Sequence, residues 1–121
     1  MIYILLPAYN EEKNLKRIFK KIEKICQNKL NISVVLVDDC SKDNTELLAK
    51  NKYKFKLIYV IHKKNKGLSI TMETGFNYIL KKAKEKDIIV TLDSDNTHPI
   101  SIIPRMIKKI SSGNDIVIAS R

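Results

Sequence analysis

The chain has 121 residues, enough for one domain with a single hydrophobic core. Hydrophobic residues make up 44% of it, which excludes a disordered chain, and no apolar run reaches the roughly 18 residues needed to span a bilayer. The formal net charge of +10 fits an anionic membrane surface, phosphorylated substrates, or simply solvated helix faces rich in Lys. Because Lys is not interleaved with Arg and aromatic residues as in nucleic-acid-binding modules, we expect no nucleic-acid partner.

The first apolar segment, residues 1–6, is too short for a signal peptide because Pro7 ends it, so we expect a cytoplasmic protein that begins with a strand. Further along, continuous β-branched runs alternate with stretches of helical period. The predicted strands are residues 3–6, 32–37, 55–61, 87–92 and 115–119. The predicted helices are residues 11–26, 44–51 (capped by Asp43 or Asn44), 68–83 and 99–110. This alternation predicts a Rossmann-like α/β fold, a mostly parallel sheet with helices on both faces.

Most of the segments that follow the predicted strands are rich in polar and charged residues, whereas the strands are nearly free of charge. Ligands of open parallel sheets bind beyond the carboxyl ends of the strands, so these segments form the candidate site. They are residues 7–11, 38–41, 63–67, 93–95 and 120–121.

Two carboxylates, Asp93 and Asp95, flank one small residue at a predicted strand end. Mg²⁺ and Mn²⁺ prefer hard oxygen ligands and are often held by a couple of carboxylates together with substrate phosphates. We expect an ion here that neutralises a departing diphosphate. The alternative is a polar turn in which Asp93 caps the residues that follow, since Asp and Ser are common in turns.

Two other segments offer contacts to a nucleotide. Asp38 and Asp39 end the second predicted strand, where a carboxylate can accept hydrogen bonds from a base or a ribose, cap the next helix, or do both. Residues 7–11 offer backbone groups and the ring of Tyr9 for stacking on a nucleobase; the alternative is a helix entry capped by Asn10.

These segments, in this order, resemble the family 2 glycosyltransferases. The matching segments are residues 6–11 (strand-Pro-x-Tyr-Asn-Glu in the family), 37–41 (Val-Asp-Asp-Gly-Ser), 65–67 (Asn-x-Gly) and 93–95 (Asp-x-Asp). His98 and Pro99, with the closing Ser-Arg segment at residues 115–121, are similar to the dolichyl- and polyprenyl-phosphate sugar transferases in particular. The resemblance covers nearly the whole chain.

The resemblance implies a role for each matched residue. The residues that would contact the nucleotide-sugar are Pro7, Tyr9, Glu11, Asp38, Asp39 and Asp93. Asp93 and Asp95 would hold Mg²⁺ or Mn²⁺, with Thr97 at the position where relatives often carry a Gln that assists the metal. Asp95 and Arg121 would be catalytic, with Arg121 meeting a phosphate of the acceptor.

By the same resemblance, residues 1–121 are a single nucleotide-sugar-binding domain, the nucleotide-binding half of a GT-A fold without its C-terminal acceptor part. The implied activity is metal-dependent, inverting transfer of a sugar from a GDP- or UDP-sugar to a polyprenyl or dolichyl phosphate. The alternative is a truncated nucleotide-sugar-binding module without transfer activity. A nicotinamide or methyl-donor enzyme is disfavoured, because the first strand is not followed by a Gly-rich turn.

Two departures from the family pattern lead to further expectations. Cys40 replaces the usual Gly, which suggests a backbone that avoids positive φ, or a turn that differs from the family's. Family members continue well past the Ser-Arg segment, and without that part apolar surface would be exposed, so we expect self-association. The basic surface leads us to expect peripheral contact with an anionic membrane at its cytoplasmic face.

Overall fold

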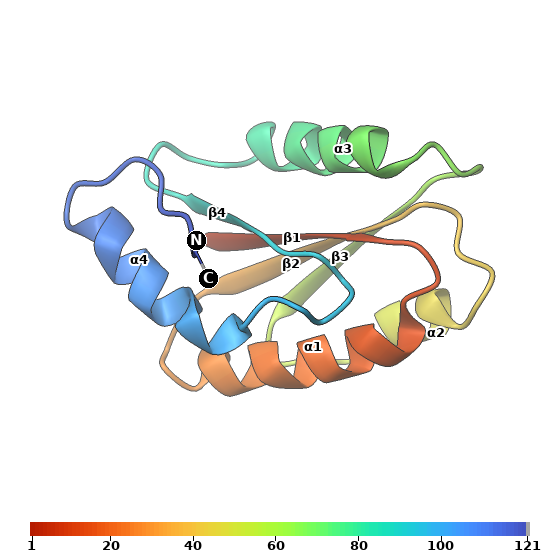
Figure 1. Cartoon of the computed structure of the whole chain (residues 1–121), viewed down its shortest axis with the longest axis horizontal. Coiled ribbons are helices and arrows are strands. Elements are labelled where there is room, and N and C mark those ends of the chain that lie inside the picture. Colours follow the sequence, from red (N-terminus) through yellow and green to blue (C-terminus); the bar gives the residue numbers. More distant parts are fainter. Residues whose placement is uncertain (121) are drawn as a thin grey trace.

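A four-stranded parallel sheet forms the centre of the computed structural model, which describes residues 1–120. The strands, in the order β3-β2-β1-β4, are β1 (Ile2–Ala8), β2 (Ile32–Asp38), β3 (Lys56–Ile61) and β4 (Ile88–Thr91). Because the four strands run in the same direction, their carboxyl ends meet at one edge of the sheet (Figure 1). The candidate segments that follow β1 to β4 lie along this edge.

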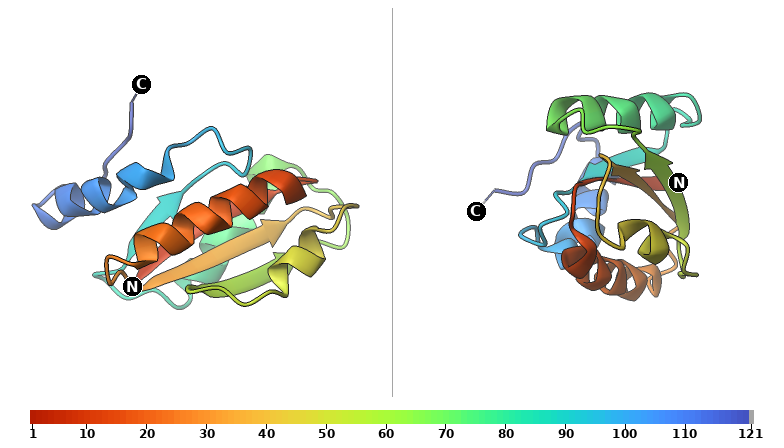
Figure 2. Two further views of the ribbon diagram at one scale, coloured as in Figure 1. Left: turned by 90° about the horizontal axis from the view of Figure 1, so that it is seen from below. Right: turned by 90° about the vertical axis from the view of Figure 1, so that its right-hand side faces the viewer.

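Helices cover both faces of the sheet (Figure 2). One face carries α1 (Glu12–Cys26), α2 (Thr45–Ala49), the short 3-10 helix η1 (Ile100–Ile102) and α4 (Ile103–Ser111). The other face carries α3 (Leu68–Leu80). The prediction of a mostly parallel α/β sheet with helices on both faces is confirmed. Among the described residues, no helix is both long and apolar enough to cross a bilayer.

The side chains of β1 alternate between two core clusters. Ile4 and Leu6 pack in the cluster that α1 covers, whereas Tyr3 and Leu5 pack in the cluster beneath α3. Every residue of β1 and β2 is buried, as expected for the two central strands of a sheet that is covered on both faces.

The first strand is longer than predicted, since it runs through Pro7 to Ala8. The Pro7 carbonyl accepts a hydrogen bond from the Ser94 hydroxyl, beyond the last β1–β4 pair, which is Leu5 with Thr91. The side of Pro7 that lacks an N–H therefore faces a part of the edge where β4 has already ended. Its missing donor removes no hydrogen bond from the ladder, so a proline is tolerated in a central strand.

The sequence pattern places on one apolar stripe of the helix predicted at residues 68–83 the side chains of Leu68, Met72, Phe76, Ile79, Leu80 and Ala83. In α3 this expectation is wrong at Leu68 and Leu80, which are exposed. The buried residues of this helix are Thr71, Gly75 and Ile79. A Cβ atom at Gly75 would overlap the side chain of Leu5. The absence of a side chain there lets α3 approach β1 closely and sets the height of the helix above the sheet.

The fifth predicted strand, residues 115–119, is not formed: within residues 1–120 this segment pairs with no strand. A groove of about 900 Å³ is lined by this segment, α4 and the outer edge of β4. Ile116 and Ile118 are 78% and 82% exposed. β-branched residues favour a strand only where a neighbouring strand completes the ladder, and the sequence pattern does not reveal whether such a neighbour exists.

Candidate functional site

A cavity of about 300 Å³ opens at the carboxyl edge of the sheet. Its wall is built from the last two residues of β1, from residues that follow β1, β2 and β4, and from the first turn of α3 and the loop before it. The lining residues are Pro7, Ala8, Tyr9, Glu11, Asp39, Asn65, Gly67, Leu68, Thr71, Asp93, Ser94 and Asp95. The structure thus brings together six residues predicted to form the site, namely Pro7, Tyr9, Glu11, Asp39, Asp93 and Asp95.

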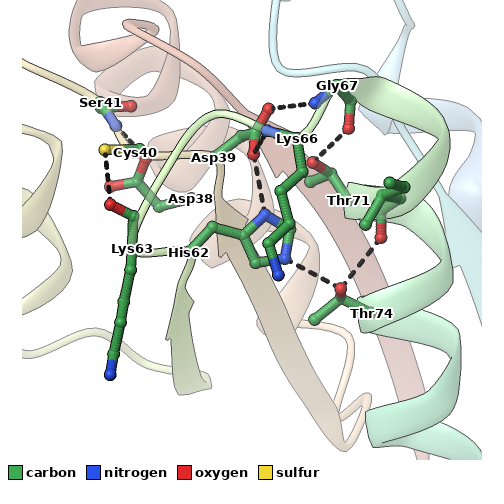
Figure 3. A network of polar contacts seen from close by, with 11 residues as sticks. Asp38, Asp39, Cys40, Ser41, His62, Lys63, Lys66, Gly67, Thr71 and Thr74 are labelled. Carbon is green, nitrogen blue, oxygen red and sulfur yellow. Dashed lines mark hydrogen bonds and ion pairs between the residues drawn. The ribbon is translucent and has the colours of Figure 1, made fainter.

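Asp39 is the most connected carboxylate of this cavity. Its Oδ1 accepts hydrogen bonds from the backbone N–H of Lys66 at 2.8 Å and from Nδ1 of His62 at 2.8 Å (Figure 3). Its Oδ2 accepts from the N–H of Gly67 at 2.9 Å. Burial alone would raise the pKa of Asp39, but the hydrogen bonds from His62, Lys66 and Gly67 outweigh it and lower the pKa below its ordinary value. Asp39 is therefore ionised at neutral pH and holds the start of α3 against the end of β2.

Asp38 does not line the cavity, although the family resemblance implies that it contacts the nucleotide-sugar. It is 1% exposed, and both of its oxygens are engaged. Its Oδ1 accepts from the N–H of Ser41 at 2.8 Å, and its Oδ2 accepts from the Tyr59 hydroxyl. Burial and the hydrogen bond to Asp38 raise the pKa of Tyr59. In this arrangement Asp38 shapes the turn that presents Asp39.

The turn after β2 contains a backbone conformation that the sequence does not predict. Cys40 has a φ of 66°, in the left-handed region, so the expectation that its backbone avoids positive φ is wrong. Its thiol donates to the carbonyl of Lys63, with 3.6 Å between sulfur and oxygen. The turn keeps the conformation that a glycine would adopt, and the hydrogen bonds around it impose this conformation on a residue with a side chain.

Asp43 ties the first turns of α1 and α2 together. Its Oδ2 accepts from the N–H of Glu12 at 3.1 Å, and its Oδ1 accepts from the N–H and the hydroxyl of Thr45 at 3.1 and 2.6 Å. Of the two residues proposed as caps of α2, Asp43 provides the side-chain bond and Asn44 does not. Burial alone would raise the pKa of Asp43, but the bonds from Thr45 and Glu12 lower it.

Asn10 does not cap α1, in contrast to the alternative considered from sequence. Its φ is 54°, and its side-chain oxygen accepts from the N–H of Lys42 at 2.8 Å. Its own N–H donates to the Ser41 hydroxyl at 2.9 Å. The loops after β1 and β2 are therefore fastened to each other, which fixes Tyr9 and Glu11 relative to Asp39. Tyr9 is 44% exposed, so its ring is accessible at the cavity.

The segment that follows β4 has fewer hydrogen bonds to other elements than the segment that follows β2. Ser94 is buried and donates to the Pro7 carbonyl, which fastens the end of β4 to the end of β1. Asp93 is exposed, and its Oδ2 lies 3.7 Å from Nε2 of His98. Asp95 is exposed, and its Oδ1 accepts from both the hydroxyl and the N–H of Thr97, at 2.7 and 3.1 Å. These two hydrogen bonds, the hydroxyl first, lower the pKa of Asp95 and keep it ionised.

The donor set at this edge fits a divalent cation held jointly with a ligand. Among residues 1–120 there is no group of three or more His, Cys, Asp or Glu side chains that could hold an ion by themselves. Asp93 and Asp95 both line the cavity and supply two hard carboxylates, which is the set that Mg²⁺ uses when substrate phosphates and water complete its shell. Thr97 does not line the cavity; its hydroxyl is directed to Asp95. Arg121 lies outside the described residues.

His62 is the polar residue of this region that sequence analysis missed. It follows β3 directly, is buried, and joins Asp39 to Thr74 of α3. The one signal in the sequence is that this histidine ends an apolar strand, ahead of the lysines of the next loop. Its partner Asp39 lies 23 positions earlier, so only the pairing of β2 with β3 reveals the contact.

Comparison with known sequences identifies the class of protein. The profile of "Glycosyl transferase family 2" matches residues 3–121. The chain therefore belongs to glycosyltransferase family 2, as its motifs suggest.

Two curated relatives show how the chain compares in length. It is 38% identical to the dolichol-phosphate mannosyltransferase of Pyrococcus furiosus, in an alignment that covers 99% of this chain and 33% of that protein. It is 35% identical to the UDP-N-acetylglucosamine–dolichyl-phosphate N-acetylglucosaminyltransferase of Methanococcus voltae, with 100% of this chain and 52% of that protein covered. The chain spans about a third to a half of the length of these relatives.

Solved structures resemble the fold. The crystal structure of S. aureus TarS 1-349 in complex with UDP matches 89% of this chain and 32% of that chain, with a TM-score of 0.66 and 26% sequence identity. The complex of the same protein with UDP-GlcNAc matches with a TM-score of 0.62, again over 89% of this chain and 31% of that chain, at 26% identity. This likeness confirms the predicted GT-A fold class.

Proposed function

We propose that this chain is the donor-binding part of a metal-dependent, inverting glycosyltransferase that moves a sugar from a nucleoside diphosphate sugar to a polyprenyl or dolichyl phosphate. The observation that carries the proposal is the single cavity at the carboxyl edge of the sheet, where Tyr9, Asp39, Asp93 and Asp95 come together in a chain of glycosyltransferase family 2. The names of the relatives support a lipid-phosphate acceptor. The UDP and UDP-GlcNAc complexes of TarS support a nucleotide-sugar donor. The nucleotide of that donor would be UDP or GDP.

In this proposal one side of the cavity binds the nucleoside and the other binds the metal and the diphosphate. Tyr9 would stack on the nucleobase and Asp39 would accept a hydrogen bond from it, while Pro7 and Glu11 would line the rest of the nucleoside site. Asp93 and Asp95 would hold Mg²⁺ or Mn²⁺ against the donor diphosphate. The bound ion would neutralise the charge of that diphosphate as it leaves. Thr97 would act through Asp95, because its hydroxyl and N–H fix the direction of that carboxylate.

The transfer itself would need no strong general base from this chain. A phosphate acceptor is ionised near neutral pH, so one of its oxygens can bond to the anomeric carbon while the bond from that carbon to the diphosphate breaks. Attack from the face opposite the leaving group inverts the configuration. Arg121 would pair with the acceptor phosphate. The residues of the cavity would contribute orientation and charge neutralisation.

We also propose that this chain contacts a membrane surface peripherally and associates with itself. The net charge of +10 supports peripheral contact with an anionic membrane surface, where a lipid-linked acceptor would lie. The exposed Ile116 and Ile118 support self-association of this chain.

Calorimetric titration tests the donor site. The chain is titrated with UDP, GDP and their sugar conjugates, with and without Mn²⁺, and folding is checked by circular dichroism. We expect one base to bind in a metal-dependent manner, and Asp95→Ala to abolish the metal dependence. Glu85→Ala, which removes an exposed acid before the start of β4, at the opposite end of that strand from the site, serves as the control and should bind as the unaltered chain does. A folded chain that binds none of these nucleotides would contradict the proposal.

A second candidate, donor binding without transfer, applies to this chain alone. It is favoured by the fact that the chain spans a third to a half of the relatives it matches. Nucleotide binding without turnover of a polyprenyl phosphate would support this candidate, and turnover by the chain itself would exclude it.

A further inference from the structure

A chain of hydrogen bonds connects Asp39, at the candidate nucleotide site, to α3. It consists of Asp39 after β2, His62 after β3 and Thr74 within α3 (Figure 3). His62 is held there by its backbone as well, because its N–H donates to the Asp38 carbonyl at 2.8 Å and so prolongs the β2–β3 ladder by one residue. His62 is 7% exposed and does not line the cavity, so it would act on a ligand there only through a neighbour.

Both nitrogens of the His62 ring are occupied. Nδ1 lies 2.8 Å from Oδ1 of Asp39, and since an ionised carboxylate only accepts, Nδ1 is the donor. Nε2 lies 2.9 Å from Oγ1 of Thr74, whose hydroxyl can itself donate to the Ile70 carbonyl at 2.9 Å. A doubly protonated ring donates to Oγ1, and a neutral ring accepts from it. In both states Thr74 fixes the ring so that the Nδ1 proton is directed at Asp39.

Three donors therefore converge on the Asp39 carboxylate, and they come from one short segment. His62, Lys66 and Gly67 all belong to the stretch that joins β3 to α3. Oδ1 accepts two of the hydrogen bonds and Oδ2 accepts one, which leaves one of the roughly four lone-pair positions of the carboxylate free on Oδ2. Because Asp39 and Gly67 both line the cavity, this arrangement sets the shape of its wall and leaves an acceptor for a ring N–H or amino group of a nucleobase.

We propose that His62 is a positioning residue for the nucleobase: acting through Asp39, it orients the carboxylate so that Oδ2 remains available to the ligand. This inference rests on the function proposed above. Without the Nδ1 donor, the carboxylate would be held only by the N–H groups of Lys66 and Gly67, one on each oxygen, and would be freer to rotate. The hydrogen bonds of His62 go to Asp38, Asp39 and Thr74 and not to Asp93 or Asp95, so we expect its effect to be confined to the half of the ligand that carries the base.

The test compares two ligands that both contain a diphosphate, only one of which carries a nucleoside. Affinities for the nucleoside diphosphate that binds (UDP or GDP) and for inorganic pyrophosphate are measured with Mn²⁺ present. We expect His62→Ala to weaken nucleoside diphosphate binding by about tenfold, the value of one hydrogen bond, and to leave pyrophosphate binding unchanged. His62→Asn, whose amide can replace the Nδ1 donor, should restore most of the affinity. Equal losses for both ligands, or no loss for either, would overturn the proposal.

A second measurement needs no ligand. Amide hydrogen exchange should speed up at Lys66 and Gly67 in His62→Ala, because their acceptor is no longer held, and should stay unchanged at Leu15 in α1. If His62→Ala does not fold, Thr74→Val carries the test, since it removes the outer partner of the ring and should reproduce both effects at a smaller size. A wild-type chain that binds no nucleotide would refute the proposed function as well, whereas normal nucleotide binding by every variant would refute only the role of His62.

Discussion

Asp38 and Asp39, at the end of β2, are 1% and 4% exposed, whereas the side chain of Asp93, at the end of β4, is 57% exposed. The first pair accepts hydrogen bonds from Ser41 in the turn after β2, from Tyr59 of β3, and from His62, Lys66 and Gly67 between β3 and α3. The partners of Asp93 and Asp95 lie within five positions in the same loop.

The difference shows how one sheet edge can hold two acidic sites for different purposes. Carboxylates that accept hydrogen bonds on both oxygens from several segments are part of the folded framework, and removing them leaves donors unpaired. Carboxylates that stay exposed keep oxygen lone pairs available and repel each other until a cation arrives. In the function proposed above, the buried pair would form a preformed nucleoside side, and the exposed pair a diphosphate side that the metal and the ligand complete.

The largest expected effect is on the free energy of unfolding, which should fall much more when Asp39 of the buried pair is removed than when Asp93 of the exposed pair is removed. Asp39→Ala would leave the buried ring of His62 and the part-buried N–H groups of Lys66 and Gly67 without their acceptor, so we expect the free energy of unfolding to fall by about 3 kcal/mol. Asp93→Ala would remove one distant contact to His98 at an exposed position, and we expect a change below about 0.5 kcal/mol. Urea unfolding followed by circular dichroism measures both. Similar losses in the two variants would contradict the distinction.

The second prediction concerns the support beneath the buried pair. Gly67, the N-cap residue of α3, donates to Asp39, and the height of this helix depends on the contact of Gly75 with Leu5. Gly75→Ala would force the helix away from the sheet, and we expect it to reduce the free energy of unfolding by about 2 kcal/mol. Asn77→Ala, an exposed change in the same helix, is the matched control and should be nearly neutral. A stabilising Gly75→Ala would show that the helix can shift at no cost.

The third prediction sets the dependence of stability on pH. The pKa values of Asp39 and Asp43 are lowered in the folded protein, so their ionised forms stabilise it at a pH above the unfolded pKa of about 3.9. This contribution is lost as the pH falls through the folded values. We therefore expect the free energy of unfolding to decline below about pH 4, and to decline less steeply in Asp43→Asn. Unfolding curves from about pH 6 to pH 2 measure this, and an unchanged slope in Asp43→Asn would contradict the assignment.

The smallest expected effect lies in the turn that presents the buried pair. Cys40→Gly would relieve a left-handed backbone but would also lose the thiol contact to Lys63 and add freedom to the unfolded chain. We expect a net stabilisation of about 0.5 kcal/mol. Cys40→Ala, which keeps the strained backbone and loses the thiol contact, should be less stable than the parent, as thermal unfolding would show. The reverse order of the two variants would be inconsistent with strain at this residue.

Much of the architecture is readable in the sequence because its signals are local. The β-branched run at residues 32–37 predicts a buried strand, the apolar spacing in residues 11–26 predicts α1, and the acidic pairs are recognisable from their place after strands. Asp39, Asp93 and Asp95 therefore could be expected at one edge, and the structure places all three in the lining of one cavity.

The remaining features depend on contacts between segments that are distant in sequence. His62 becomes a partner of Asp39 only through the register of β2 with β3, which pairs Asp38 with Ile61. The strand expected at residues 115–119 has a suitable composition, but within residues 1–120 it lacks a neighbour to complete a ladder. Cys40 adopts a glycine-like φ because surrounding hydrogen bonds impose it, which no residue preference would predict.

The most direct test of a preformed nucleoside side and a metal-completed diphosphate side is a count of bound Mn²⁺. Free Mn²⁺ is followed by electron paramagnetic resonance while the chain is mixed with the ion, first alone and then with the nucleoside diphosphate that it binds. We predict that about one equivalent of Mn²⁺ disappears from the free signal only when the nucleotide is present, and that Asp93→Asn combined with Asp95→Asn prevents this. Uptake of Mn²⁺ that is the same without nucleotide, or that survives both substitutions, would contradict the account.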